Sequence, residues 1–227
     1  MTTTLITGAN KGLGKETARQ LIAAGHTVYV GARDEARGRE AAGELGARFV
    51  QLDVTDDASV AAAFAQIEAG GGLDVLVNNA GIGMVALNGP DALRVFDTNA
   101  VGIIRVTEAA LPLLLKSENP VVVNISSALG SFWANHEPSR PASHYPAIVY
   151  GASKAAVSML TVQYARAVPE VKFNAVEPGF TATELGGAKN ERGRPVEISA
   201  RTIVRMAAIG KGGPTGTFAE DDGELGW

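Results

Sequence analysis

Tyr150 and Lys154 are the two residues whose types and spacing most directly suggest chemistry. They lie four residues apart in the stretch VYGASKAAVSML, so on a helix their side chains share one face. A free tyrosine has a pKa near 10, which makes it a poor proton donor at neutral pH. A cation about 4 Å away, at an effective dielectric constant near 20, would favour the phenolate by roughly 4 kcal/mol, or about three pKa units. The pair could therefore perform acid–base catalysis, with an exposed Tyr–Lys pair of no function as the alternative.

A glycine-rich stretch near the N-terminus, TGANKGLG, is the second candidate. It follows the first predicted strand and opens the first predicted helix. Gly8, Gly12 and Gly14 would let the backbone approach a pyrophosphate, whose negative charge the helix N-terminus would favour. The spacing differs from the ordinary GxGxxG. The position after the first strand favours dinucleotide binding, and a tight turn without a ligand is the alternative.

Short β-branched, apolar runs predict the strands that must position these residues. They are Leu5–Ile6, Thr27–Val30, Phe49–Leu52, Val75–Val77, Val121–Ile125 and Val171–Val176. Amphipathic helical stretches alternate with them, which predicts an α/β fold with a parallel sheet covered on both faces. We expect a single-domain Rossmann-type doubly wound sheet over residues 1–227, with ligands beyond the carboxyl ends of the strands.

The composition limits the classes of function. The chain has 227 residues, of which 46% are hydrophobic and 19% charged, and its net charge is −4. These values give no electrostatic case for nucleic acid or an anionic membrane as a partner. Cysteine is absent and the three histidines have no ligand spacing, so we expect no metal. We see no secretion signal and no apolar run of membrane-spanning length, and we therefore expect a cytoplasmic protein.

Six motifs in one order give the sequence a resemblance to a known family. They are TGANKGLG, Asn78-Asn79-Ala80-Gly81, Asn99, Ser127, Tyr150-xxx-Lys154 and Pro178-Gly179. Together they resemble the short-chain dehydrogenase/reductase family from residue 7 to about residue 183. The long segment before the tyrosine and the signatures TGANKG and ARD resemble its carbonyl-reductase branch.

The resemblance implies four catalytic residues. Tyr150 would donate the proton, Ser127 would hold the substrate carbonyl, and Asn99 would anchor a water in the proton relay. Lys154 would tune the phenol and bind the nicotinamide ribose. Ser127 is preferred because the family places its catalytic serine three residues before a glycine, and Ser126 is the fallback.

The resemblance also implies a set of cofactor contacts in the glycine-rich turn and in the loops that follow the strands. They are Gly8, Asn10, Lys11, Gly12, Leu13, Gly14, Arg33, Asp53, Val54, Asn79, Ala80, Gly81, Tyr150, Lys154, Pro178, Gly179, Thr181 and Thr183.

The end of the second predicted strand bears on the choice between NADP and NAD. NAD-preferring relatives usually place an acidic residue there for the ribose 2′-hydroxyl, whereas this chain has Ala32 followed by Arg33. Lys11 and Arg33 would converge on a 2′-phosphate, and the arginine suits forked hydrogen bonding. We therefore expect NADP(H), with a solvated Arg33 at a helix start as the alternative. Asp34 is expected to cap the next helix.

These implications predict an NADPH-dependent reductase of ketones or aldehydes. The alternatives are an alcohol dehydrogenase that works oxidatively and a non-catalytic NADP-sensing protein. The expected partner is a small carbonyl compound or alcohol, with no nucleic acid and no membrane. Because an inserted segment at residues 131–149 precedes the helix that many relatives use for pairing, we expect a monomer or small homo-oligomer. Residues placed where they could line the substrate pocket are Met84, Phe132, Trp133, His136, Tyr145 and Leu185.

Overall fold

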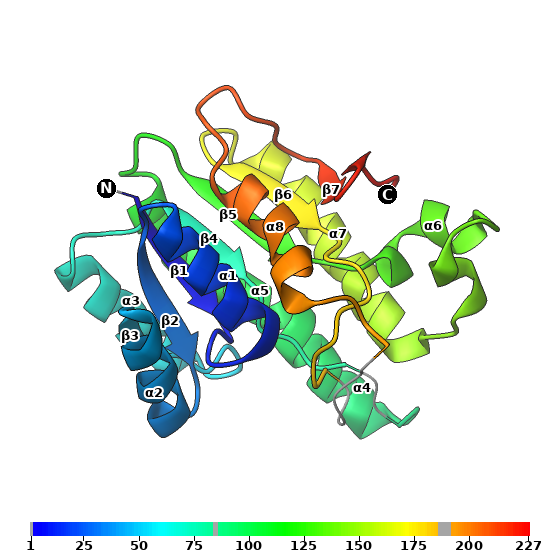
Figure 1. The fold of residues 1–227 in the computed structure, drawn as a ribbon, viewed down its shortest axis with the longest axis horizontal. Helices are drawn as coiled ribbons and strands as arrows, with labels where there is room; N and C mark the ends of the chain where they lie inside the picture. Colours follow the sequence, from blue (N-terminus) through cyan, green and yellow to red (C-terminus); the bar gives the residue numbers. More distant parts are fainter. Residues whose placement is uncertain (1, 84–85, 186–191) are drawn as a thin grey trace.

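The computed structural model describes residues 2–83, 86–185 and 192–227, and the strands of these residues join in one sheet (Figure 1). The strands are β1 (Thr3–Thr7), β2 (Thr27–Ala32), β3 (Arg48–Gln51), β4 (Val75–Asn78), β5 (Val121–Ile125), β6 (Lys172–Val176), β7 (Phe218–Glu220) and β8 (Gly223–Glu224). The α-helices are α1 (Gly12–Ala23), α2 (Glu35–Leu45), α3 (Asp57–Ala69), α4 (Gly89–Phe96), α5 (Gly102–Leu114), α6 (Phe132–His136), α7 (Ile148–Ala167) and α8 (Val196–Ala207). Three shorter helical segments are the π-helix η1 (Asp97–Val101) and the 3₁₀-helices η2 (Ala128–Gly130) and η3 (Pro141–His144).

The order of the strands is β3-β2-β1-β4-β5-β6-β7-β8. Strands β1 to β7 pair in parallel, and only β8 joins antiparallel to β7. The chain leaves β1 toward β2 on one side and returns to β4 on the other. The carboxyl ends of β1 and β4 therefore flank the point where the winding reverses, where ligands bind in such sheets.

Helices cover both faces of the sheet, and each face has its own apolar core (Figure 1). Residues of α3, α5 and α7 pack on one face together with Leu76, Val122 and Phe173. Residues of α1, α2 and α8 pack on the other with Ile6, Val77 and Val123. Because β4 and β5 lie between two helical layers, every residue in both strands is buried. The predicted doubly wound α/β sheet is confirmed.

Local sequence signals set several helix boundaries. Asp34 caps α2, since its carboxylate accepts a hydrogen bond from Arg37 N at 3.0 Å, as predicted. Asp56 caps α3 in the same way, and Gly46 ends α2 in the left-handed conformation with φ 65°. The six predicted strands are present, whereas β7 and β8 were not predicted. None of the helices in the described ranges has the length and apolar character needed to cross a bilayer.

Candidate active site

Helix α7 places Tyr150 in its first turn and Lys154 one turn later. The Lys154 Nζ atom lies 5.6 Å from the centroid of the Tyr150 ring. Lys154 is buried, with 5% relative exposure, and its Nζ donates a hydrogen bond of 2.7 Å to the Ile125 carbonyl at the end of β5. The lysine thus lies beside the face of the ring, and its ammonium is directed to the backbone of β5.

The expected lowering of the Tyr150 pKa by Lys154 does not occur in this arrangement. Burial of the phenol, together with the charge of Glu177, raises the Tyr150 pKa above its ordinary value, and a hydrogen bond with Ser127 opposes the increase. Tyr150 as a whole is half-buried. Burial also lowers the pKa of Lys154 to about 8, against the opposing charge of Glu177. Desolvation therefore dominates the acid–base properties of both residues.

The two candidate serines have different surroundings. Ser126 is buried at 1% relative exposure, and its hydroxyl bonds to the Lys154 carbonyl at 3.0 Å and to Ser158 Oγ at 2.8 Å. Ser127 is partly exposed; its hydroxyl accepts a hydrogen bond of 3.3 Å from Leu129 N, and its interaction with the phenol opposes the increase in the Tyr150 pKa. Ser127 is therefore the serine that acts on the phenol, which favours it over Ser126.

Asn99 lies in the π-helix between α4 and α5, a kind of helical irregularity that is frequent at functional sites. Its side-chain oxygen accepts a hydrogen bond of 2.8 Å from Ile82 N, and its nitrogen donates to Ile82 O at 2.9 Å and to Ser153 Oγ at 3.0 Å. The amide thus ties the loop after β4 to α7. The role of Asn99 in holding a relay water stays a prediction.

The glycine-rich turn and the loop after β4 pack tightly against each other. Gly8 and Gly12 have φ values of 65° and 55°, which other residues rarely adopt. A methyl group at position 14 would lie 2.5 Å from Asn79 Nδ2, the atom that donates 2.8 Å and 3.2 Å hydrogen bonds to Thr7 O and Gly8 O. Lys11 is the N-cap residue of α1, and its side chain accepts no hydrogen bond from the N–H groups of the first turn. The N–H groups of this helix end are therefore arranged for an anion.

Gly81 lies between this turn and two of the candidate catalytic residues. A methyl group at position 81 would lie 3.3 Å from Asn99 Oδ1 and 3.8 Å from Lys154 Nζ. Ala80 N donates a 2.9 Å hydrogen bond to Thr7 Oγ1, which fixes the loop to the end of β1. Gly81 therefore lies directly beside the lysine ammonium.

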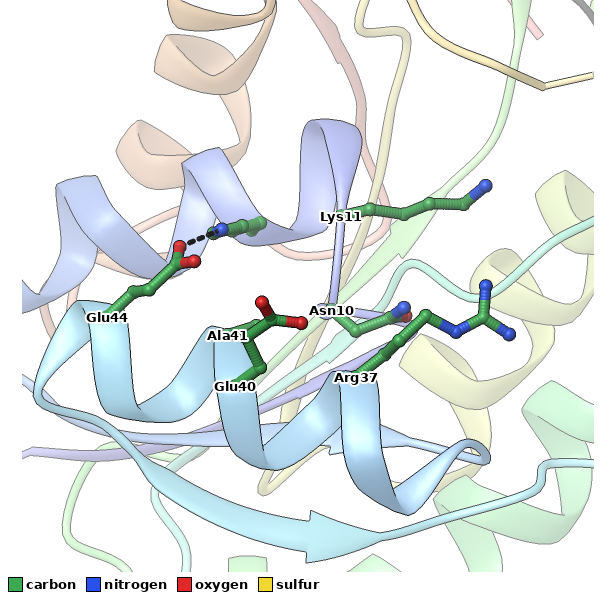
Figure 2. A pocket seen from close by; sticks show the side chains of 7 residues that line it. Asn10, Lys11, Arg37, Glu40, Ala41 and Glu44 are labelled. Carbon is green, nitrogen blue, oxygen red and sulfur yellow. Dashed lines mark hydrogen bonds and ion pairs between the residues drawn. The ribbon is translucent and has the colours of Figure 1, made fainter.

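A pocket with charged walls opens between the start of α1 and α2 (Figure 2). It is lined by Asn10, Lys11, Lys15, Arg37, Glu40, Ala41 and Glu44. Figure 2 shows the side chains of Lys11 and Arg37 extending in the same direction on either side of Asn10. Lys11 Nζ also pairs with Glu184 at 2.6 Å, and Arg37 pairs with Asp34 at 2.7 Å.

Arg33 is exposed at the carboxyl end of β2 but does not line this pocket. Its charge acts on Asp53: burial would raise the Asp53 pKa, but hydrogen bonds from Thr55 and the charges of Arg33 and Arg105 lower it. The sequence analysis did not identify Arg37 as a candidate cofactor-binding residue. The available signal was its place in the first turn of a helix that starts at the carboxyl end of a strand.

The loop after β6 brings its candidate residues toward the glycine-rich turn. A methyl group at position 12 would lie 3.6 Å from Thr183 Cγ2. Thr181 Oγ1 donates to Gly179 O at 2.7 Å and shares a 2.7 Å hydrogen bond with Ser199 Oγ. Asp53 and Val54 lie in the loop after β3, which also follows the carboxyl end of a strand. Val54 is buried against α5.

The guanidinium of Arg194 also anchors the loop after β6. It donates to Pro178 O and to Ser199 Oγ, and it pairs with Asp221. The described part of the loop is therefore anchored at Pro178 and Thr181.

The inserted segment is fastened to the C-terminal tail. Trp133 N donates to Trp227 O at 2.9 Å, and Ser131 Oγ donates to Gly226 O at 2.6 Å. The Arg140 guanidinium lies 5.5 Å from the Trp133 ring centroid and also pairs with Glu220. Of the predicted pocket residues, Phe132, Tyr145 and Leu185 are largely exposed, Trp133 packs against the tail, and Met84 lies outside the described residues.

Comparisons with known proteins identify the family of the chain. Residues 2–193 match the family model described as short chain dehydrogenase. The chain is 35% identical to the short-chain dehydrogenase/reductase ATR10 of Stachybotrys chlorohalonatus, over 96% of this chain and 88% of that protein. It is 30% identical to (-)-isopiperitenone reductase of Mentha piperita, over 97% and 96%. The NADPH-bound carbonyl reductase from chicken fatty liver superposes with a TM-score of 0.85 at 28% identity, covering 99% and 98% of the two chains. The chain therefore belongs to the short-chain dehydrogenase/reductase family of oxidoreductases.

Proposed function

We propose that the protein is an NADPH-dependent reductase that transfers hydride to the carbonyl carbon of a ketone or aldehyde, with Tyr150 as the proton donor. The observation that supports this most directly is the convergence of Tyr150, Ser127 and Lys154 beside the loop after β4. The comparison with an NADPH-bound carbonyl reductase is a second support.

The described residues fit a nicotinamide dinucleotide. The uncapped N-terminus of α1 suits a pyrophosphate, and the Lys154 ammonium beside Gly81 suits the hydroxyl groups of a ribose. Lys11 and Arg37, with Arg33 nearby, suit a 2′-phosphate. When bound, the cofactor supplies the hydride. Asp53 and Val54 would face its adenine, and Thr181 and Thr183 its nicotinamide half.

The proton that the carbonyl oxygen receives would come from a side chain of this protein. The phenol of Tyr150 carries a proton at neutral pH, because burial raises its pKa above an ordinary value that is already near 10, and it needs a nearby cation to become an effective proton donor. Tyr150 Oη would donate this proton to the carbonyl oxygen while Ser127 Oγ donates a hydrogen bond to the same atom. The Lys154 ammonium, 5.6 Å from the ring centroid, would stabilise the phenolate that remains.

The substrate would be a small carbonyl compound. A cytoplasmic location, a single domain over residues 1–227 and a monomeric or small homo-oligomeric state remain predictions.

The test is a spectrophotometric assay of NADPH oxidation with acetophenone, benzaldehyde and menadione, each compared with NADH. We expect turnover with at least one carbonyl compound and a clear preference for NADPH. Reduction of NADP⁺ by the matching alcohols, without carbonyl reduction, would point to an oxidative dehydrogenase. Tight binding of NADPH without turnover in either direction would point to a cofactor-sensing protein.

A further inference from the structure

The buried side of α7 carries polar side chains where the helix crosses the carboxyl end of β5. Lys154, Ser158 and Thr161 follow one another at spacings of four and three residues, so they share one side of the helix. All three are buried. The reaction described above gives a role to Lys154 alone. Ser158 and Thr161 are therefore two buried hydroxyl groups on the catalytic helix that the reaction does not use.

Two of these side chains are bonded to consecutive residues at the end of β5. Lys154 Nζ donates to Ile125 O at 2.7 Å. Ser126 Oγ donates its single hydrogen to the Lys154 carbonyl at 3.0 Å. The 2.8 Å hydrogen bond between the Ser126 and Ser158 hydroxyls therefore has Ser158 as its donor.

The third side chain is bonded to Asn124, one residue earlier in β5. Asn124 Nδ2 donates to Thr161 Oγ1 at 2.9 Å, and Thr161 Oγ1 donates to Val157 O at 2.9 Å. Asn78 Nδ2, on the neighbouring strand β4, donates to Asn124 Oδ1 at 2.9 Å and so fixes the orientation of that amide. Because these groups are buried, a shift of α7 along β5 would leave several of them unpaired, which costs free energy.

The rest of the contact between α7 and the sheet is apolar. Tyr164, Ala165 and Val168, toward the end of the helix, pack against the core that contains Val122 and Phe173. Apolar side chains can repack, and a core then loses its unique arrangement before it loses its stability. The hydrogen bonds to the end of β5 are therefore the part of this interface that selects one position of the helix.

We propose that Ser158 and Thr161 are positioning residues that fix the place of α7 on β5, and therefore the place of the Tyr150 phenol. Both act through the helix, since they lie one and two turns beyond Lys154 on the side that faces the strand. This rests on the proposed reductase function, in which the phenol must meet a substrate carbonyl. A displacement of about 1 Å can lower such a rate by about 10²-fold.

Thr161→Val tests the proposal, because valine has the shape of threonine but cannot bond to Asn124. NADPH-dependent reduction is measured with the fastest carbonyl compound among acetophenone, benzaldehyde and menadione. We expect kcat to fall about 10-fold while the KM of the carbonyl compound stays within about twofold of the wild type. Thr161→Ser keeps the hydroxyl and should restore most of kcat. Ser158→Ala gives the same test if Thr161→Val does not fold.

Thr4→Val is the matched control. Thr4 is buried near the amino end of β1, away from the carboxyl ends that carry the site, and its hydroxyl bonds to His26 at 2.8 Å. Both valine variants should lower the urea midpoint of unfolding, but Thr4→Val should leave kcat unchanged. An equal fall of kcat in the two variants would overturn the proposal, because lost stability would explain it. An unchanged kcat in Thr161→Val would overturn it as well.

Chemical labelling of Lys154 tests the position of α7 without any substrate. Acetylation by acetic anhydride at pH 8 is followed by mass spectrometry in the cofactor-free protein. The buried ammonium of the wild type should react slowly, and that of the double variant Ser158→Ala/Thr161→Val about 10-fold faster. Thr4→Val should react like the wild type, and equal rates in all three proteins would overturn the proposal. This measurement stands even if none of the three carbonyl compounds is reduced, so its failure is distinct from a failure of the proposed function.

Discussion

Replacing Lys154 by methionine should stabilise the cofactor-free protein while removing its activity. Lys154 is buried, and desolvation lowers its pKa from 10.5 to about 8. At 1.36 kcal/mol per pKa unit, this corresponds to about 3.4 kcal/mol by which the folded state disfavours the ammonium. Methionine has a similar length and no charge, so the variant lacks this penalty. Ile125 O loses its donor, which opposes the gain by about 1–3 kcal/mol. The net stabilisation at pH 7 should be about 1–2 kcal/mol.

The dependence of the free energy of unfolding on pH distinguishes the effect of the Lys154 charge from the effect of side-chain packing. Between pH 8 and 10.5 the unfolded chain holds a proton on Lys154 that the folded chain has lost, so the stability of the wild type rises with pH in this window. The penalty is fully present below pH 8 and has largely disappeared above 10.5. From pH 7 to 10, the wild type should gain about 2.5 kcal/mol relative to Lys154→Met.

Urea unfolding at pH 7, 8, 9 and 10 measures this difference in the free energy of unfolding. Lys116→Met is the control, because Lys116 is 68% exposed in a surface ion pair and should show a difference that is small and independent of pH. A constant difference between wild type and Lys154→Met across this range would refute the reasoning, since it would mean that the ammonium is not desolvated.

Further predictions concern the acid, the cofactor, the turn and the assembly. Tyr150→Phe should keep the melting temperature and NADPH affinity but lower turnover by at least about 10²-fold, and a variant that keeps a tenth of the rate would contradict this. Arg33→Ala and Arg37→Ala should each narrow the preference for NADPH over NADH by about 1.5–3 kcal/mol in titrations, whereas Arg39→Ala, on the same helix, should not. Gly14→Ala should destabilise the fold by about 1–3 kcal/mol in urea unfolding, because its methyl group overlaps neighbouring atoms. Light scattering at micromolar concentration should find a monomer or small oligomer, and a stable tetramer would contradict this.

Much of the fold could be predicted because its signals are local. The buried strands are runs of β-branched residues, such as Val121–Ile125, that need no partner to be recognised. The cap at Asp34 also depends only on neighbours in the chain. Strands β7 and β8 could not be found in this way, because Phe218–Glu220 is too short to show a pattern and becomes a strand by pairing with β6.

The candidate catalytic residues were predicted from motifs, but the structure determines their surroundings. Spacing alone placed Lys154 beside Tyr150, and a lowered pKa for the phenol followed from that picture. The structure instead directs the ammonium to Ile125 O, and burial raises the pKa of the phenol. Desolvation depends on the atoms that surround a group in three dimensions, and no spacing in the chain reports it.

Sequence by itself determined the order of the first six strands and the glycine-rich turn, because these depend on residue type and on neighbours within a few positions. The resemblance to a family, also read from the sequence, singled out Ser127, Tyr150 and Lys154. Tertiary structure alone brought the carboxyl group of Glu177 to Ala128 N, 49 residues away in the chain, and brought Arg37 to the same pocket as Lys11. It also fastened the inserted segment to the tail through Trp133 and Trp227. The residues in these contacts are far apart in the sequence and become neighbours only when the sheet forms. A pattern of residues along the chain therefore cannot predict them.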